Sequence, residues 1–366
     1  LTLDSDLQHA VQRSLAAACE KSHAAGGTAI VLDPKTGDIL ALANCPTYNV
    51  NDRARTSPEC RMNRAVTAPF EPGSTLKVIT AAAALEEHLV SASSDFYCTG
   101  RMKVGRRSIG CAHGDQHGSE SLNDVIKNSC NIATAQMGFK LGKTTLHRYE
   151  KLFGFGEKLE SGLPGESRGL LTPPEQWSDI QLANVAFGQG ISVTPLQLAA
   201  AYAAIANDGV YLRPRIVRGV RNPDTEQVTP DPIPQGRRVV SPQTAQEMRR
   251  MLQSVVDGGT GKLAQLDSYT AGGKTGTAQI AENGHYGGKF VASFVGMAPA
   301  AAPQFVVLVA ITDPKGGHYG GVVAGPVFKE ICEKALIARR VPRDKAEHPA
   351  AKKRRQRQDA AAVAEA

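Results

Sequence analysis

The sequence predicts an α+β fold, in which an antiparallel β-sheet is flanked by helices and joined to an all-helical lobe. Two apolar segments near the start of the chain and three near its end have the length and composition of strands, and a long helical stretch separates the two groups. The 366 residues are 42% hydrophobic and 21% charged, which provides for a sizeable core. Global disorder is excluded, because it requires low hydrophobicity together with high net charge.

The first part of the chain predicts a helix, a hairpin and a buried helix in that order. Residues 6–22 place apolar side chains at helical spacing, at Leu7, Val11 and Leu15 among others. Strands are expected over 28–32 and 38–43, because the intervening Asp33-Pro-Lys-Thr-Gly37 is typical of a turn. Residues 72–85 are apolar on nearly every side, which indicates a buried helix.

The remaining elements follow from the same kind of pattern. Helices are expected over residues 122–141, 145–153, 177–187, 194–207 and 242–256, the last after a proline-rich loop at 222–242. Strands are expected over 274–280, 290–297 and 305–312, followed by a glycine-rich turn region at 316–325 and a closing helix over 327–339.

The positive charge is concentrated at the end of the chain. The net charge is +7, of which residues 339–366 carry +5 and the first 338 residues only +2. We therefore divide the chain into a domain over 1–340 and a basic tail over 341–366, expected to be solvated and disordered, although Lys352-Lys-Arg-Arg355 suits contact with an anionic surface. With 5% aromatic residues and no basic–aromatic interleaving, no nucleic-acid partner is expected. No run of about 18 apolar residues predicts a membrane span.

The cysteines and histidines do not predict a metal site. Seven cysteines occur without any Cys-x-x-Cys, and the nine histidines show no ligand spacing, so neither a metal nor a cofactor is expected. Cys98 and Cys111 lie 13 residues apart, and both a disulfide and two reduced thiols agree with that spacing. Cys130 is expected to be small apolar packing.

Ser74-Thr-Leu-Lys77 has the spacing of a serine nucleophile with a lysine base. Residues three apart share one face of a helix, and this pair opens the buried helix. A lysine amine with an ordinary pKa of about 10.4 is too basic to accept a serine proton at neutral pH, but burial lowers that pKa by up to about 3–5 units. The pair alone is a weak signal, because one such spacing is expected by chance.

Two further motifs each occur twice, and the context separates the copies. Ser121-Leu-Asn123 begins a predicted helix, where Ser121 suits an N-cap, so Ser129-Cys-Asn131 is the better functional candidate. Lys35-Thr-Gly37 is the hairpin turn, whereas Lys274-Thr-Gly276 opens a strand and continues into Thr277. Taken singly, Ser129 also suits a core hydroxyl and Thr275 an ordinary strand residue.

In this order, Ser74-x-x-Lys77, Ser129-x-Asn131 and Lys274-Thr-Gly276 resemble the three motifs shared by penicillin-binding proteins and serine β-lactamases. Further stretches resemble class B penicillin-binding proteins of the division and sporulation types, and the similarity extends over about residues 1–338. These stretches are Phe70-Glu-Pro-Gly-Ser-Thr-Leu-Lys77, Gln176-Trp-Ser-Asp-Ile180, Phe187-Gly-Gln-Gly190 with Val193-Thr-Pro-Leu-Gln197, and Tyr319-Gly-Gly-Val-Val-Ala-Gly-Pro-Val327. The resemblance implies the penicillin-binding/serine β-lactamase-like fold.

The resemblance implies a peptidoglycan D,D-transpeptidase that works through a serine acyl-enzyme and releases D-alanine. Ser74 would be the nucleophile, Lys77 its base and Ser129 the proton relay, linked to Lys274. Substrate binding would fall to Asn131, Lys274, Thr275, Gly276 and Thr277, with the backbone N–H groups of Ser74 and Thr277 as the oxyanion hole. The Cys98/Cys111 pair, with His117-Gly118, also resembles this subgroup, which favours the disulfide.

The same resemblance implies partners and a location. The partners would be stem peptides as donor and amine acceptor, β-lactams as covalent inhibitors, a membrane glycan polymerase and division proteins. The domain would work on the outer face of the bacterial cell membrane, held there by an N-terminal anchor that lies outside this chain, which begins at Leu1. A D,D-carboxypeptidase, a β-lactam sensor and a non-catalytic scaffold stay open as alternatives. A β-lactamase is disfavoured, because Glu166 lies in what resembles a structural turn rather than beside the motifs.

Overall fold

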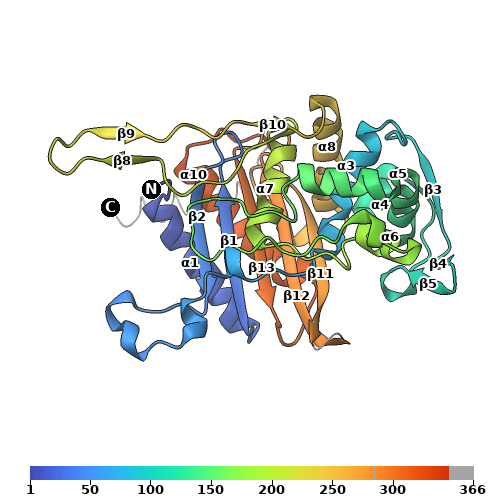
Figure 1. The fold of residues 1–366 in the computed structure, drawn as a ribbon, viewed down its shortest axis with the longest axis horizontal. Helices are drawn as coiled ribbons and strands as arrows, with labels where there is room; N and C mark the ends of the chain where they lie inside the picture. The colour runs from blue at the N-terminus through green and yellow to red at the C-terminus, as the bar shows by residue number, and fades with distance from the viewer. Residues whose placement is uncertain (283–284, 346–366) are drawn as a thin grey trace, which may run out of the picture.

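A five-stranded antiparallel sheet forms the centre of the molecule, as the computed structural model of residues 1–282 and 285–345 shows (Figure 1). Its strand order is β11-β12-β13-β1-β2, which places the two ends of the chain in one sheet. The strands are β1 (Gly26–Leu32), β2 (Ile39–Cys45), β11 (Gly272–Glu282), β12 (His285–Ala298) and β13 (Phe305–Thr312). The α+β prediction and all five predicted strands are confirmed.

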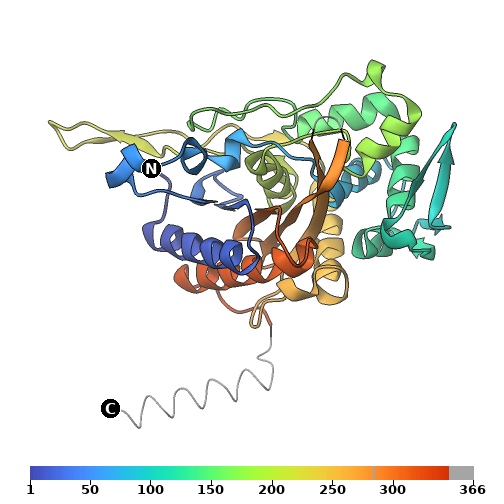
Figure 2. The same cartoon turned by 90° about the horizontal axis from the view of Figure 1, so that it is seen from below.

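Two helices from opposite ends of the chain cover one face of this sheet. α1 (Ser5–Lys21) and α10 (Gly325–Ala338) lie side by side beneath the strands (Figure 2). The predicted apolar stripe of α1, including Leu7, Val11 and Leu15, is buried in this layer. The Asp4 side chain accepts a hydrogen bond from the Leu7 backbone N–H at 3.0 Å and so begins the helix.

The other face of the sheet is covered by buried helices. All twelve residues of α7 (Pro195–Ala206) are buried against β1, β12 and β13. Thr194 and Gln197 form a capping box, with bonds of 3.1 Å and 2.7 Å, that begins α7. α3 (Lys77–Glu86) is also buried and begins after a 3₁₀ turn (Gly73–Thr75), so the helix predicted over 72–85 is split in two. α8 (Pro242–Gly258) packs against β11.

The helical lobe differs from its prediction at one point that matters for the site. The expected helix over 122–141 is broken into α4 (Leu122–Asn128) and α5 (Asn131–Leu152), with α6 (Asp179–Ala186) packed on α5. Ser129 ends α4 in a left-handed conformation, φ +65°, and the Cys130 sulfur caps α5 by accepting from the Ala133 N–H. The helix expected over 145–153 is the second half of α5, beyond a kink at Gly142.

The segment between α3 and α4 forms two small ribbons that the sequence did not predict. β3 pairs with β6 and β4 with β5; the bounds are β3 (Asp95–Cys98), β4 (Arg101–Val104), β5 (Arg107–Gly110) and β6 (Gly118–Ser121). The disulfide between Cys98 and Cys111 that the resemblance favours is not formed in this structure. Both thiols are free with their sulfurs 3.6 Å apart, and the Cys111 sulfur lies as close to that of Cys130, at 3.7 Å.

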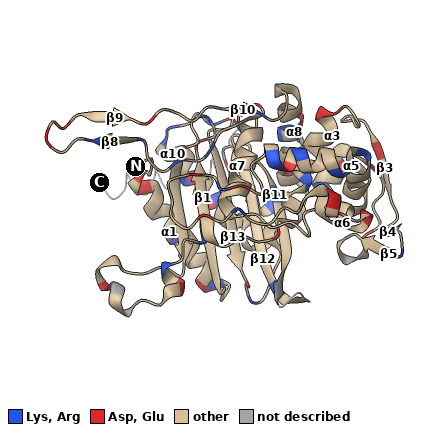
Figure 3. Ribbon diagram, viewed as in Figure 1, with Lys and Arg blue, Asp and Glu red and all other residues tan. Residues whose placement is uncertain are grey.

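The remaining elements are short. They are α2 (Arg64–Thr67), α9 (Gly320–Val323), β7 (Val210–Tyr211), β8 (Gly219–Arg221), β9 (Val228–Pro230), β10 (Arg237–Arg238) and 3₁₀ turns at Val50–Arg55, Pro58–Arg61, Ala112–Gly114, Pro174–Gln176 and Lys262–Ala264. β8 and β9 form a hairpin that extends away from the body, and only β9 lies within the region 222–242 that was expected to be a loop (Figure 1). Lys, Arg, Asp and Glu are distributed over both the body and the lobe, while β13 carries no charged residue (Figure 3).

The predicted division at residue 340 stays a prediction. Residues 341–345 contact the segment before β11, for example through the Tyr269 hydroxyl, which donates to the Val341 carbonyl at 2.9 Å. The basic cluster at 352–355 and the rest of the tail over 346–366 lie outside the described residues. Within the part of the chain that the structure describes, no helix combines the length and the apolar character needed to cross a bilayer.

A buried ion pair joins the start of β2 to the connection after α7, and its loss is expected to destabilise the fold. Asp38, only 4% exposed, accepts from Arg215 Nε at 2.6 Å and from Arg218 at 2.8 Å. We expect Asp38→Ala to lower the free energy of unfolding by about 3 kcal/mol, because it leaves the buried Arg215 charge uncompensated. Urea unfolding checks this. The exposed Asp267, which pairs with Lys329, provides the control, since Asp267→Ala should cost at most about 1 kcal/mol.

Candidate active site

Ser74 lies where the edge strand β11 meets the helical lobe, in the 3₁₀ turn that leads into α3. Its side chain is half-buried, and among the described residues nothing hydrogen-bonds its hydroxyl. The turn is held by the Gly73 N–H, which donates to the Gly188 carbonyl at 2.9 Å. Gly188 has φ +89°, and a Cβ there would lie 2.1 Å from the Gly73 carbonyl oxygen. Glycine at 188 therefore allows the close approach that sets the position of Ser74.

Lys77 follows Ser74 by one helical turn and is completely buried. Its Nζ donates to the Ser129 carbonyl at 2.5 Å and to Asn131 Oδ1 at 2.6 Å, and it lies 3.2 Å from Ser129 Oγ. Burial lowers the pKa of Lys77 to about 8, against the opposing attraction of the thiols at 130, 111 and 98 and of Glu120. About one Lys77 amine in ten is thus neutral at pH 7, and the neutral form is the one that a general base requires.

Ser129 and Asn131 reach Lys77 because the chain breaks between α4 and α5. The left-handed Ser129 turns its carbonyl and hydroxyl toward Nζ, and Asn131 begins the next helix facing the same amine. The Asn131 Nδ2 donates to the Gly110 carbonyl at 2.8 Å, which fixes the orientation of its oxygen toward Lys77. The structure thus brings Lys77, Ser129 and Asn131 together as predicted.

The segment Lys274-Thr-Gly-Thr277 runs along β11 beside the Ser74 turn. A Cβ at Gly276 would lie 2.3 Å from Ser293 Oγ and 3.1 Å from the Pro72 carbonyl, so only glycine allows β11 to approach that turn. The Thr277 hydroxyl accepts from the Gly320 N–H at 3.1 Å, and the Thr275 hydroxyl donates to Thr260 at 3.0 Å.

Lys274 is completely buried but does not hydrogen-bond Ser129. Its Nζ has only distant partners, the Thr275 carbonyl at 3.4 Å and the Thr275 hydroxyl at 3.5 Å. The pKa of Lys274 is held well below its usual value, mainly because the amine is buried and also because of the charge of Lys77. Two buried amines therefore share one site, and the charge of Lys77 disfavours the protonated form of Lys274.

The alternative copies of the motifs lie elsewhere. Ser121 caps α4 by accepting from the Asp124 N–H at 3.2 Å, as predicted, and Asn123 accepts from Ser254 at 2.9 Å. Lys35 is exposed in the hairpin turn and pairs with Asp208 at 3.4 Å.

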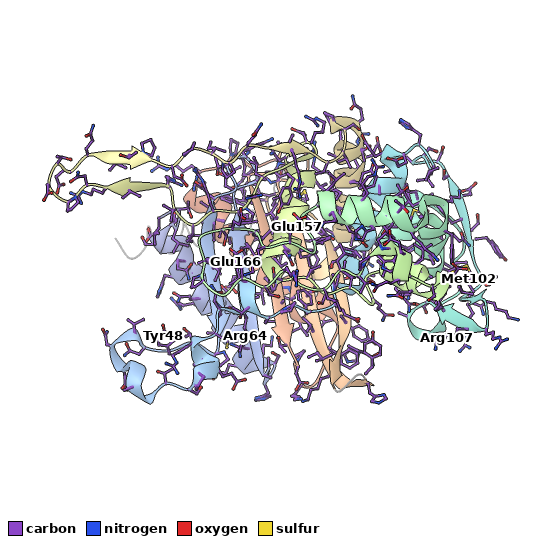
Figure 4. The ribbon with its side chains drawn as sticks, in the orientation of Figure 1. Tyr48, Arg64, Met102, Arg107, Glu157 and Glu166 are labelled. Carbon is purple, nitrogen blue, oxygen red and sulfur yellow. The ribbon has the colours of Figure 1, made fainter. Side chains whose placement is uncertain are left out.

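Glu166 also has a structural role, and it lies in the connection between α5 and α6 (Figure 4). Its carboxylate accepts from the backbone N–H groups of Glu160 at 2.8 Å and Ser161 at 2.7 Å, and from the Ser161 hydroxyl. This carboxylate closes a turn rather than serving the residues around Ser74.

Several groups at the site were not found from the sequence. Thr260 and the Gly320 N–H bind the two threonine hydroxyls, and Tyr286 near the tip of β12 donates to both Glu71 oxygens at 3.0 and 3.1 Å, just before the Ser74 turn. These contacts link residues 15 to 215 positions apart, and no local pattern marks them. Chemically, an unbonded serine hydroxyl, a buried amine and hydroxyl-bearing strand residues suit acyl transfer.

Comparisons with known proteins agree with this geometry. Residues 27–333 match the family model described as penicillin binding protein transpeptidase domain. Stage V sporulation protein D of Bacillus subtilis is 39% identical over 341 residues, which cover 92% of this chain and 53% of that protein. Peptidoglycan D,D-transpeptidase FtsI of Escherichia coli is 35% identical over 334 residues, covering 90% of this chain and 54% of that one. Penicillin binding protein 3 of Mycobacterium tuberculosis, solved with aztreonam, superposes with a TM-score of 0.87 at 36% identity, covering 94% of this chain and 79% of that one. The chain spans about half the length of the curated relatives it matches.

Proposed function

This chain belongs to the penicillin-binding protein transpeptidase family, and on that basis we propose that it is a peptidoglycan D,D-transpeptidase domain. It cross-links stem peptides through an acyl-enzyme on Ser74, with release of D-alanine. The observation that carries the proposal is the buried Lys77, whose amine is held by Ser129 and Asn131 one turn after an unbonded serine hydroxyl. The alternative functions lack a distinguishing feature in the described residues, and the test below separates them.

In the first half-reaction Ser74 Oγ attacks the carbonyl carbon between the two terminal D-alanines, and Lys77 accepts the Ser74 proton. The C–N bond then breaks, and the departing amine takes a proton through the Ser129 hydroxyl, 3.2 Å from Lys77. D-Alanine leaves, and the rest of the stem peptide stays as an ester on Ser74. In the second half-reaction an acceptor amine attacks this ester, forms the new amide and returns the proton and the free hydroxyl to Ser74.

Asn131, Lys274, Thr275, Gly276 and Thr277 are proposed to bind the donor peptide. The Thr275 and Thr277 hydroxyls receive the terminal carboxylate, and the arrival of that anion favours the protonated form of Lys274 beside it. The backbone N–H groups of Ser74 and Thr277 lie on the two segments that Gly276 allows to approach, and they form the oxyanion hole. One such donor contributes about 3–4 kcal/mol in other acyl-transfer enzymes.

β-Lactams react by the same route. Ser74 opens the lactam amide, but the amine stays attached to the acyl group and blocks the acceptor, so the ester persists. Because the substrate is peptidoglycan, the domain works at the outer face of the cell membrane. Its proposed partners are a membrane glycan polymerase and division proteins. Its proposed anchor is a segment outside this chain.

The test supplies a peptide ending in D-Ala-D-Ala, with and without a second stem peptide as acceptor. We expect D-alanine release matched by cross-linked product when the acceptor is present. Release without cross-linking would instead identify a carboxypeptidase. A penicillin adduct with neither product would identify a sensor. No reaction with peptide or antibiotic would identify a scaffold, and turnover of the antibiotic would identify a β-lactamase. Ser129→Ala should lose cross-linking, while Ser121→Ala, in the copy of the motif that only caps a helix, should keep it.

The rate of penicillin acylation is expected to depend on the protonation of Lys77. Below its pKa of about 8 the ammonium has no lone pair to accept the Ser74 proton, so the rate should rise about tenfold per pH unit and level off above about pH 8. Stopped-flow or quenched mass measurements across that range check this. A rate that is flat through pH 8 would contradict a general-base role for Lys77.

A further inference from the structure

Three cysteines and a histidine meet beside the active-site segment, although they are scattered over 33 residues of sequence. Their ligand atoms all lie within 4.8 Å of one another, and the four residues are Cys98, Cys111, His117 and Cys130. The three cysteines are buried, and the histidine side chain is only 15% exposed. They come from the ends of β3 and β5, the start of β6 and the α4–α5 junction, next to the β4–β5 hairpin that carries Met102 and Arg107 (Figure 4).

The three distances from the Cys111 sulfur match those within a tetrahedral metal site, and the other pairs of ligand atoms lie within 4.8 Å. The Cys111 sulfur lies 3.6 Å from that of Cys98, 3.7 Å from that of Cys130 and 3.8 Å from His117 Nδ1. Zinc bonds of about 2.3 Å to sulfur and 2.0–2.1 Å to nitrogen, at tetrahedral angles, place the ligand atoms about 3.6–3.8 Å apart. A disulfide needs sulfurs about 2.05 Å apart and would use only two of these side chains.

A buried carboxylate beside the cluster points independently to a cation. Glu120 is 3% exposed, and its Oε2 has no hydrogen-bond partner among the described residues. That oxygen lies 3.7 Å from His117 Nδ1, while Oε1 accepts from Asn128 at 3.0 Å. A buried carboxylate oxygen without a hydrogen bond is costly, and a cation within the cluster offsets that cost.

The surrounding chain also supports thiolate ligands. The Gly100 N–H donates to the Cys98 sulfur and the Ala133 N–H to the Cys130 sulfur, both at 3.4 Å. Both contacts favour the deprotonated sulfurs that metal ligation requires.

Residues 95–121 form a unit of the small size that proteins often stabilise with a disulfide or a structural metal. Residues 95–121 form two two-stranded ribbons, and such ribbons are marginally stable on their own. Their outward residues are exposed, Tyr97 at 66% for example, while inward residues such as Phe96 and Ile109 join the core. A metal that joins β3, β5, β6 and the α4–α5 junction would supply a further constraint.

We propose that this chain binds one zinc ion through the three sulfurs of Cys98, Cys111 and Cys130 and through the imidazole of His117. Three soft thiolates and one imidazole in a closed tetrahedron are the ligand set of a structural zinc site. Binding forms three Zn–S bonds and one Zn–N bond, and the protons of the thiols are released to water.

The bound zinc would also hold in place the segment that contains Ser129 and Asn131. Cys130 lies between Ser129 and Asn131, the two residues that hold the Lys77 amine, and Cys111 follows Gly110, whose carbonyl orients Asn131. Zinc at this position would fix the break between α4 and α5 without contacting the proposed substrate. The inference rests on the cluster and stands whether or not the proposed transpeptidase activity is found.

The experiment measures metal in the 366-residue chain, purified reduced, without a metal-binding tag and without chelators. We expect about one zinc per chain by elemental analysis. After exchange for Co²⁺, we expect the thiolate-to-metal charge-transfer band and the intense visible bands of a tetrahedral site. Cys98→Ser and Cys130→Ser should lose the zinc. Cys60→Ser should retain the zinc, because Cys60 lies outside the cluster, where its sulfur accepts a hydrogen bond from the Ser57 hydroxyl.

Other outcomes would overturn the proposal. A reduced, folded chain that takes up neither zinc nor cobalt would do so, as would a Cys98–Cys111 disulfide whose reduction is not followed by metal binding. Zinc kept in Cys98→Ser, or lost equally in Cys60→Ser, would place the metal elsewhere. If the cluster variants do not fold, the cobalt spectrum of the unmodified chain decides, because three thiolate ligands give a charge-transfer band that nitrogen and oxygen ligands do not.

Discussion

Ser74→Ala is expected to form no covalent adduct with a penicillin, whereas the unmodified chain should gain the mass of one antibiotic per chain. The ester oxygen of the proposed acyl-enzyme is Ser74 Oγ, and alanine has no atom that replaces it. Transpeptidation should fall by at least about a thousandfold, since nucleophile, base and oxyanion donors act as a unit. Intact-mass measurement after incubation with the antibiotic checks the adduct directly.

The same substitution should leave the fold intact, which makes the result interpretable. The Ser74 hydroxyl makes no hydrogen bond within the described residues, and the turn is held by backbone contacts between Gly73 and Gly188. Thermal unfolding of Ser74→Ala should therefore match that of the parent within a few degrees. Ser57→Ala, at an exposed serine of the 3₁₀ turn before α2, is the matched control and should acylate normally. An adduct that persists on Ser74→Ala would assign the nucleophile to another residue and remove the basis of the proposed mechanism.

The strands and most helices were predictable, because their apolar patterns are continuous in sequence. β13 is eight residues without a charge, and α7 carries no charged residue between Thr194 and Asn207, so the local sequence of each predicts its burial. The motifs Ser129-x-Asn131 and Lys274-Thr-Gly276 could be selected over their copies by context. Ser121 precedes a helix and Lys35 lies in a turn, and the structure places both outside the site.

What could not be predicted depends on contacts between distant segments. The break at Ser129 arises because a cysteine sulfur, an uncommon N-cap, begins α5, and because the Lys77 amine binds the carbonyl that the break exposes. The ribbons of residues 95–121 are short and polar, with no periodicity to reveal them. The cysteine–histidine cluster has no local spacing either, because tertiary folding alone brings Cys130 to Cys111. Cys130 is buried in the apolar core as expected, and its sulfur also lies 3.7 Å from that of Cys111.

Lys77→Met should separate catalysis from stability, because the proposed base is also a source of instability. Methionine has a similar volume and no basic nitrogen, so the acylation rate should fall by about 10²–10⁴-fold, the usual contribution of a positioned base. Lys35→Met, in the exposed copy of the Lys-Thr-Gly motif, should leave the rate unchanged.

The stability of Lys77→Met should change in the opposite direction. Burial lowers the pKa of Lys77 from 10.5 to about 8, so at neutral pH folding disfavours the protonated amine by about 3 kcal/mol. The hydrogen bonds to Ser129 and Asn131 recover about 1 kcal/mol each. Lys77→Met should therefore be at least as stable as the parent at pH 7.

The pH dependence tests the sign of this effect. The destabilisation by Lys77 is fully present below pH 8, falls as the pH rises from about 8 toward 10.5, and is absent above 10.5, where the amine is neutral in both states. The stability of the parent relative to Lys77→Met should thus rise through that window in urea unfolding. A variant that loses both activity and several kcal/mol of stability at pH 7 would show that the amine is held as a stabilising ion. Lys77 would then be a structural cation, and the base in the reaction of Ser74 would have to be another group.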